Sequence, residues 1–168
     1  PNRDCGGFSE GGLGSAAEYR AWIDAFAAGI GQRKAVILVE PDGLTVTDCF
    51  DRDPAALAER FALVGYAVST FKRNPNAAVY IEAGDNHRNR VDEIVPILQA
   101  ANIAQADGFF LNATVYQYTS AEVAYGRAIS AAVGGKHFVV DTSRNGLGPN
   151  ADWCNAQGRA LGLAPTTN

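Results

Sequence analysis

Acidic and amide side chains follow four short apolar segments of this sequence. Asp42, Glu82 and Asn112 come at or soon after the ends of three segments, and Asp141 and Arg144 follow the fourth. A set of carboxylates with one arginine, and without a nucleophilic Ser–His pair, suits general acid–base catalysis. Hydrolysis of a glycosidic bond is one such reaction, because it needs a protonated carboxyl group and a second carboxylate nearby.

Asp42 is the candidate proton donor. The segment Ala35–Val39 reads AVILV, an apolar run typical of a parallel strand that is buried on both faces. Pro41 has no N–H for a sheet ladder, so the strand should end before it and deliver Glu40 and Asp42 to the surface. Burial and neighbouring acids are expected to raise the pKa of Asp42. Glu40 is expected to be structural, and an ordinary solvated turn is the alternative for both acids.

A metal site is a competing interpretation of the second acidic segment. Glu82, Asp85 and His87 lie close together in the sequence, and such groups can bind a divalent ion. The same stretch, DNHRNR, is also typical of a solvated turn. No glycine-rich phosphate motif follows a strand, so no nucleotide is expected. The leading hypothesis of acid–base hydrolysis needs no cofactor and no metal.

The spacing of apolar residues predicts the elements that position these side chains. Strands are expected at residues 35–39, 78–81, 108–111 and 137–140, and helices at 16–30, 54–71, 91–98, 120–133 and 153–161. Ser15 and Asp53 should cap the first two helices, and Trp22 should lie in the core. This alternation predicts an α/β fold with parallel strands, whose carboxyl ends meet at one edge. Residues 1–168 are interpreted as a single domain.

Composition excludes several classes of partner. The chain has 168 residues, of which 47% are hydrophobic and 19% charged, as in a folded domain. The net charge is −4 and Lys and Arg form no run, so neither nucleic acid nor an anionic membrane is an expected partner. No apolar run approaches the ~20 residues that a membrane-spanning helix needs.

Several motifs, in order along the chain, resemble glycoside hydrolase family 6. They are PNRDCG, EYRAWIDAFAAGIG, VEPD, DTSRNGLGP and DWCN. This family contains endoglucanases and cellobiohydrolases that act on β-1,4-glucan. The resemblance implies a distorted (β/α) barrel with parallel strands, and hydrolysis with inversion of the anomeric configuration.

The resemblance also implies roles for individual residues. Asp42, in VEPD, matches the family's catalytic acid, and Asp4, in NRDC, matches the aspartate that raises the pKa of this acid and helps organise the nucleophilic water. Cys5 and Cys49 match a family disulfide that ties the Asp4 loop to the loop after the first strand. The substrate-binding candidates are Ser9, Glu82, Asn112, Arg144 and Trp153.

Departures from the family pattern leave alternatives open. Where the family has an aspartate, a histidine and then a tryptophan, this chain reads YIEAGDNHRN, so Glu82 replaces the aspartate and no aromatic sugar platform follows. A catalytically impaired carbohydrate-binding relative is therefore one alternative. The family's tyrosine-bearing strand and its lysine-and-aspartate strand are missing from residues 1–168. The chain is accordingly interpreted as an internal piece of a catalytic domain, and an inactive fragment is the second alternative.

The expected partner is a β-1,4-glucan polysaccharide or oligosaccharide, with endo and exo action both open. A disulfide is typical of oxidising surroundings, so we expect a secreted protein, and we expect a monomer. Cys154 is the third cysteine, and its family partner is expected beyond Asn168.

Overall fold

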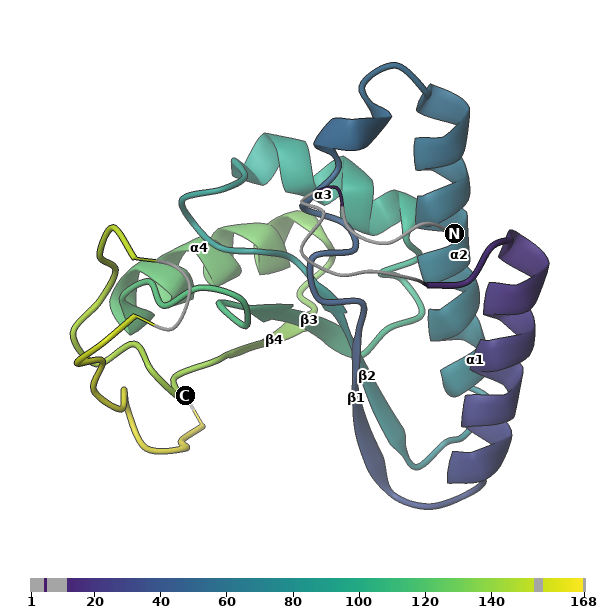
Figure 1. Cartoon of the computed structure of the whole chain (residues 1–168). Coiled ribbons are helices and arrows are strands. Elements are labelled where there is room, and N and C mark those ends of the chain that lie inside the picture. The colour runs from purple at the N-terminus through teal and green to yellow at the C-terminus, as the bar shows by residue number, and fades with distance from the viewer. Residues whose placement is uncertain (1–4, 6–11, 153–155, 168) are drawn as a thin grey trace.

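The computed structural model describes residues 5, 12–152 and 156–167 and has an α/β architecture (Figure 1). Its elements are α1 (Ala16–Ile30), β1 (Ala35–Val39), the 3₁₀ helix η1 (Asp48–Phe50), α2 (Pro54–Phe71), β2 (Ala77–Glu82), α3 (Val91–Ala100), β3 (Gly108–Leu111), α4 (Thr119–Ala132) and β4 (His137–Val140). The four strands and first four helices predicted from the sequence are confirmed closely. Side-chain caps at Ser15 and Asp53 start α1 and α2, as predicted.

The fifth predicted helix is wrong in the part that the structure describes. Residues 156–161 form a turn and irregular chain, and residues 153–155 lie outside the described residues. Gly158 has φ of 70°, a left-handed conformation that a right-handed helix cannot contain. The apolar residues of this segment are spaced as in a helix, but the conformation of Gly158 prevents a helix from forming there.

The four strands form one parallel sheet in chain order, β1-β2-β3-β4. Val39 pairs with Ile81, and Leu111 pairs with Val140, so the strands end at similar heights. Because neighbouring strands are parallel and a helix connects each pair, all four carboxyl ends meet at one edge of the sheet. The residues that follow the strands are thereby brought to the same edge.

The helices cover one face of the sheet. α1 packs against α2, α2 packs against β1 and β2, and α3 and α4 lie together (Figure 1). The core between the helices and the sheet is apolar. Its most buried members include Ile23, Val68, Val79, Ile81, Leu98, Phe109, Leu111 and Ile129. No described helix combines the length and the apolarity that crossing a membrane requires.

Burial on both faces of β1, expected from its apolar run, is wrong. Ile37 and Val39 face the helices and are buried, whereas Val36 is 72% exposed and Leu38 is 48% exposed. Alternate residues of a strand point to opposite faces, and within the described chain only one face of β1 is covered. The run of apolar residues shows that both faces avoid charge, but it does not show what covers the second face.

Trp22 also differs from its expected place in the core. Its side chain is 50% exposed and stacks on Phe26, with the ring centroids 5.4 Å apart. Both rings lie on α1 beside the free side of β1, where they line an open surface pocket with Val36 and Leu38.

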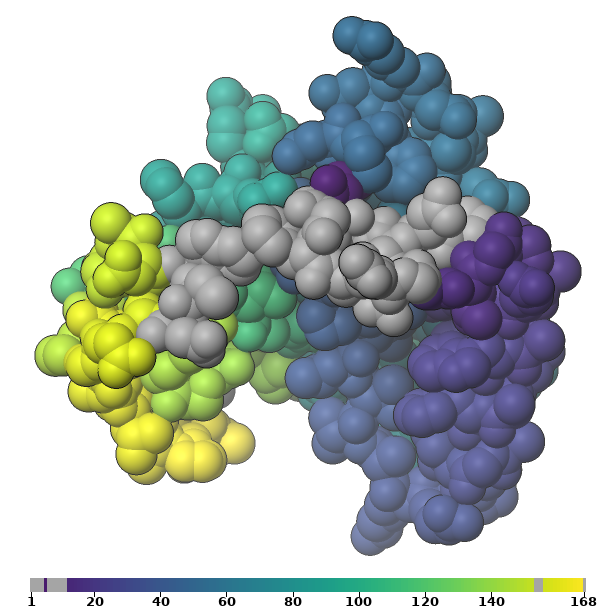
Figure 2. All heavy atoms as spheres, in the orientation of Figure 1, coloured from purple at the N-terminus to yellow at the C-terminus, as the bar shows by residue number. Residues whose placement is uncertain are grey.

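The space-filling view shows the α1–β1 part (purple to blue) and the carboxyl-terminal segment (yellow) on opposite sides of a notch (Figure 2).

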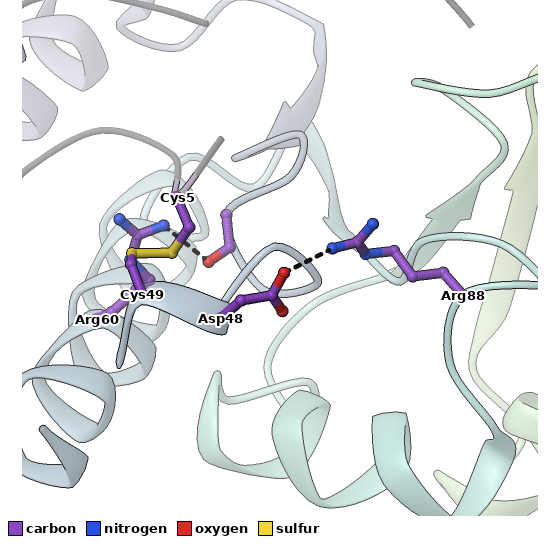
Figure 3. Close-up of a disulfide and its surroundings, with 6 residues drawn as sticks. Cys5, Asp48, Cys49, Arg60 and Arg88 are labelled. Carbon is purple, nitrogen blue, oxygen red and sulfur yellow. Dashed lines mark hydrogen bonds and ion pairs between the residues drawn. A yellow bond between two sulfur atoms is a disulfide. The ribbon is translucent and has the colours of Figure 1, made fainter. Parts of the chain in front are cut away.

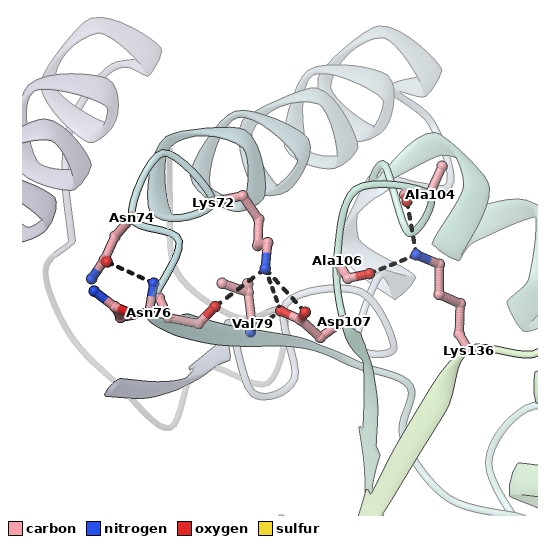
Figure 4. Close-up of polar contacts among 9 residues, drawn as sticks. Lys72, Asn74, Asn76, Val79, Ala104, Ala106, Asp107 and Lys136 are labelled. Carbon is pink, nitrogen blue, oxygen red and sulfur yellow. Dashed lines mark hydrogen bonds and ion pairs between the residues drawn. The ribbon is translucent and has the colours of Figure 1, made fainter. Parts of the chain in front are cut away.

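The amino edge of the sheet is fastened by charged side chains (Figure 4). Lys72, at the end of α2, donates to both carboxylate oxygens of Asp107, at 2.8 and 3.0 Å, and to the carbonyl of Ala77 at 3.2 Å. Asp107 also accepts the backbone N–H of Val79 at 2.7 Å. Near the start of β4, Lys136 donates to two carbonyls of the loop before β3. These contacts fix the strand starts, far from the carboxyl edge.

We predict that Asp107→Asn lowers the free energy of unfolding at pH 7 by about 1–2 kcal/mol, because it weakens charged hydrogen bonds at a partly exposed site. Burial tends to raise the pKa of Asp107, but the hydrogen bond from Lys72 helps to lower it overall. A carboxyl with a lowered pKa stabilises the fold above its unfolded pKa and loses that contribution as the pH falls through the folded value. The difference between wild type and variant should therefore shrink below about pH 4.

Urea denaturation of both proteins at pH 7 and pH 2 measures this difference. Asp92→Asn is the control, because Asp92 forms an exposed pair with Arg90 at 2.7 Å and should contribute less than about 0.5 kcal/mol. An Asp107→Asn effect that is equally large at both pH values would contradict the assignment to the Lys72 contact.

Candidate active site

The carboxyl edge of the sheet gathers polar residues from all four strand ends. Glu82 is the last residue of β2, and Asn112 and Asp141 directly follow β3 and β4. Asp42 lies in the turn after β1, half-buried, and its charge acts on Glu82. Asn112 donates to the carbonyl of Asp141 at 2.8 Å. The structure thus brings these four predicted residues to one edge.

Left-handed backbone conformations cluster at this edge. Glu40, Asp42 and Asn112 have φ of 53°, 64° and 69°, a region that non-glycine residues adopt at a cost of about 1 kcal/mol or more each. Backbone bonds close the turn after β1, from Gly43 N–H to the carbonyl of Glu40 at 2.9 Å and from Val46 N–H to the carbonyl of Asp42 at 3.2 Å. Strain of this kind is typical of functional sites, where surrounding contacts maintain it.

Two helices hold the turn that carries Asp42. From α1, the hydroxyl of Tyr19 donates to Glu40 at 2.7 Å. Burial raises the pKa of Tyr19, and the charge of Glu40 raises it further. From α2, Arg60 donates to the carbonyl of Gly43 at 3.3 Å. Glu40 therefore has the structural contact that was predicted for it, and the backbone around Asp42 is fixed on the helix side.

Glu82 is a buried carboxyl with a raised pKa. Its side chain is 2% exposed, Oε1 accepts the hydroxyl of Thr45 at 2.8 Å, and Oε2 has no hydrogen-bond partner in the described chain. Burial raises the pKa of Glu82 to about 7, and the charge of Asp42 adds to this, whereas hydrogen bonds from Thr45, Leu44 and Gly84 oppose it. At mildly acidic pH, Glu82 thus adds no negative charge beside Asp42.

Asn112 joins neighbouring strand ends. Its side chain is 1% exposed, and besides Asp141 it contacts Gln117, accepting the backbone N–H at 2.7 Å and donating to the carbonyl at 3.3 Å. Its own backbone N–H donates to the carbonyl of Gly84 at 2.8 Å. These bonds use the whole amide group to position loops, and a substrate contact by Asn112 stays a prediction.

Arg144 lies in the segment after β4. Its guanidinium stands over the ring of Tyr116, 5.3 Å from the centroid, and Arg159 stands 5.9 Å from the same centroid. The hydroxyl of Tyr116 donates to Asn150 at 2.8 Å. These contacts anchor the carboxyl-terminal segment beside the sheet edge. Asp4, Ser9, Trp153 and Cys154 lie outside the described residues, so their predicted roles stay predictions.

The predicted disulfide between Cys5 and Cys49 is confirmed (Figure 3). The two Cα atoms are 5.1 Å apart, and the bond joins residues 44 positions apart in the sequence. Cys49 belongs to η1, so the bond attaches the amino-terminal segment to the loop that follows the Asp42 turn. Beside it, Arg88 points toward Asp48, with Nη2 and Oδ2 3.9 Å apart.

The metal interpretation of Glu82, Asp85 and His87 gains no support. Among the described residues, no group of three or more His, Cys, Asp or Glu side chains is arranged to hold a metal ion. Asp85 instead uses Oδ1 to accept the backbone N–H groups of His87 and Arg88, at 2.8 and 3.2 Å. The segment is therefore a compact turn organised by Asp85.

Three residues at this edge have no signal in the local sequence. Thr45 bonds Glu82, Arg88 donates from Nε to the carbonyl of Thr45 at 2.8 Å, and Glu122 is fully buried. Glu122 comes three residues after Thr119 at a helix start, a pattern that predicts an exposed capping carboxylate. Its burial becomes evident only from the packing of α4 against the rest of the fold.

Gly84 allows the loop after β2 to approach Thr45. It has φ of 71°, and a Cβ atom at this position would lie 2.9 Å from Cγ2 of Thr45. A side chain would therefore be strained and would also push the two loops apart. The close approach allows Thr45 to reach Glu82.

The whole chain matches one protein family. The sequence model of Glycosyl hydrolases family 6 matches residues 1–168. Endoglucanase A of Thermobispora bispora is 44% identical over 174 residues, which cover 100% of this chain and 38% of that protein. Endoglucanase 1 of Streptomyces halstedii is 41% identical over 173 residues, which cover 99% of this chain and 53% of that protein. The chain thus spans about half the length of these relatives, or less.

A solved structure shares the fold. It is the endoglucanase Cel6 from Mycobacterium tuberculosis in complex with methyl-cellobiosyl-4-deoxy-4-thio-β-D-cellobioside. Its TM-score is 0.93 at 46% identity, and the match covers 99% of this chain and 57% of that one. The predicted fold class, α/β with parallel strands as part of a distorted (β/α) barrel, is confirmed by this match and by the sheet.

We predict that Glu82→Gln changes how stability depends on pH. The pKa of Glu82 is about 7 in the folded chain and 4.5 as its ordinary value. Between these values the folded state holds the proton that the unfolded state releases, so this carboxyl makes stability fall as the pH rises. Glu82→Gln should remove a fall of up to about 3 kcal/mol between pH 4.5 and 7. Burial also raises the pKa of Glu122 to about 7, so a slope of the same sign remains.

Chemical denaturation at a series of pH values measures this slope. Thr45→Val is the matched variant, because it removes a hydrogen bond that lowers the pKa of Glu82. It should extend the fall of stability to higher pH, opposite in effect to Glu82→Gln. A Glu82→Gln protein with the same slope as wild type would show that folding does not raise the pKa of Glu82.

Proposed function

Because the chain belongs to family 6 of the glycosyl hydrolases, we propose that the protein hydrolyses β-1,4-glucosidic bonds in cellulose or related β-glucans. The observation that carries this proposal is the family match over residues 1–168, which includes all four strand ends of the carboxyl edge. Endoglucanases among its relatives support the reaction. The cellobioside-type ligand of the Mycobacterium tuberculosis structure supports a glucan oligosaccharide as the partner.

Asp42 is the proposed general acid, and the reaction is proposed to invert the anomeric configuration. Its position favours this role, since a half-buried carboxyl lies in a turn that Tyr19 and Arg60 hold from two helices. A general acid must keep its place relative to the leaving oxygen, and a fixed turn supplies that. Asp4 is proposed to assist Asp42 and Ser9 to hold the attacking water.

Glu82 complements this arrangement. Because burial raises the pKa of Glu82 to about 7, its carboxyl can donate a hydrogen bond at mildly acidic pH. Glu82 is therefore proposed to contact the substrate as a protonated acid. The remaining proposed substrate contacts are Asn112, Arg144 and Trp153.

The protein is proposed to be secreted. The disulfide between Cys5 and Cys49 supports this location, because such bonds persist in oxidising surroundings. The proposed substrate is a polysaccharide too large to enter a cell intact.

Asp42→Asn is predicted to lower kcat on a soluble cello-oligosaccharide by about 100-fold or more, because the proton donor is lost. Asn is chosen because it tolerates a positive φ, so the variant removes the acid without adding the backbone strain of Ala. The full-length protein is assayed by release of reducing ends, and proton NMR of the first product identifies its anomer. An α-anomer from the β-linked substrate would establish inversion.

Asp51→Asn is the matched control, because Asp51 is an exposed aspartate after η1 and should leave kcat unchanged. Near-normal kcat in Asp42→Asn would exclude Asp42 as the general acid. Tight oligosaccharide binding by wild type without any turnover would instead favour the carbohydrate-binding relative.

A further inference from the structure

We propose that Glu122 is a positioning residue for the reaction at Asp42, acting through the loop after β2. The inference deepens the proposed glucan hydrolysis and rests on it. Glu122 lies in the first turn of α4 and is 0% exposed. Its Oε1 accepts the backbone N–H of Asn86 at 2.9 Å. Helix α4 thereby holds the loop that separates Glu82 from α3.

The second oxygen of Glu122 sets this residue apart from an ordinary structural contact. Oε2 of Glu122 and the hydroxyl of Tyr125, one turn further along α4, have no hydrogen-bond partner in the described chain. Burying such groups costs stability, so stability alone would favour an apolar side chain at this position. Burial raises the pKa of Glu122 to about 7, and the nearby charge of Asp85 raises it too. A buried carboxyl that stability alone does not favour is expected to serve the site.

The loop after β2 transmits the position of Asn86 to Arg88. Asp85 accepts the backbone N–H groups of His87 and Arg88, so residues 85–88 form one closed turn. Arg88 then reaches across to the loop after β1, where its Nε donates to the carbonyl of Thr45 at 2.8 Å. The contact from Glu122 therefore helps to position the turn from which this guanidinium group extends.

Thr45 connects this turn to the general acid. It is 5% exposed and lies three residues after Asp42, in the same run of turns. Its hydroxyl donates to Glu82, and the next residue, Val46, donates its N–H to the carbonyl of Asp42. Tyr19 and Arg60 fix the Asp42 turn from the helices, and the Glu122 chain of contacts fixes it from the neighbouring strand end.

The test compares Glu122→Gln and Glu122→Ala in the protein at its full natural length, with a soluble cello-oligosaccharide as substrate. Gln keeps an acceptor oxygen for Asn86, so kcat should stay within about twofold of wild type. Ala removes the acceptor, and kcat should fall about tenfold or more while KM changes less than about threefold, because a misplaced proton donor slows the chemical step. Wild-type kcat in Glu122→Ala would overturn the proposal.

Glu93→Ala is the matched control for a purely structural loss. Glu93 lies in the first turn of α3 and accepts the backbone N–H of Arg90 at 2.8 Å, at the other end of the same loop, but it is exposed. This variant should lose stability without losing kcat. Equal losses of kcat in Glu93→Ala and Glu122→Ala would overturn the proposal.

A double-variant cycle tests the route through Arg88. Arg88→Ala should lower kcat as Glu122→Ala does, and the double variant should lose no more than the larger single loss. Losses that multiply would show that the two residues act independently and would overturn the route.

Amide hydrogen exchange tests the same contacts without substrate. The N–H groups of Asn86 and Val46 should exchange faster in Glu122→Ala than in wild type or Glu122→Gln. Unchanged exchange at Val46, in a protein that hydrolyses glucan, would overturn the positioning role and leave the proposed function intact. Faster exchange in a protein that hydrolyses no glucan would overturn the proposed function, and with it any role of Glu122 in the reaction.

Discussion

Parallel pairing of the four strands is the constraint on which the other features depend. Because each strand runs in the same direction, the sheet has one edge of strand starts and one edge of strand ends. The pKa values of carboxyl groups shift in opposite directions at these two edges. Asp107, among the strand starts, has a lysine partner, and its pKa is lowered. Glu82, at the strand ends, is buried and has no ion pair within the described chain, and its pKa is raised. The edge of strand starts therefore stabilises the fold, and the edge of strand ends holds buried acids with raised pKa values beside a strained turn.

Local sequence patterns predict most of the helices and strands, but they do not predict which other segments pack against them. Ser15 and Asp53 start their helices as their side chains require, and apolar spacing locates the four strands. The same spacing predicts that Trp22 lies in the core and that both faces of β1 are buried. In the described chain, Trp22 is half-exposed and one face of β1 is exposed. Periodicity reports which side of an element avoids water. It contains no information on which other segment lies there.

In the candidate site too, the sequence predicts some of the residues but not the contacts between them. Strand ends are visible in the sequence, so the sequence alone is enough to name Asp42 and Glu82 as candidates. Resemblance to a family adds the Cys5–Cys49 pair, which the structure contains. The contacts that connect these residues are invisible in the sequence, because Arg88 and Thr45 are 43 positions apart and Asn86 and Glu122 are 36 apart. Only the sheet order brings such pairs together.

The uncovered side of β1 has a consequence for handling this chain in solution. β1 has a strand neighbour on one side only within the described sheet, and Val36 and Leu38 present apolar side chains to solvent. An edge strand of this kind offers unpaired backbone groups to any similar strand. Trp22 and Phe26 enlarge the apolar area beside it. In residues 1–168 produced alone, β1 is therefore a place where association between copies is expected at high concentration.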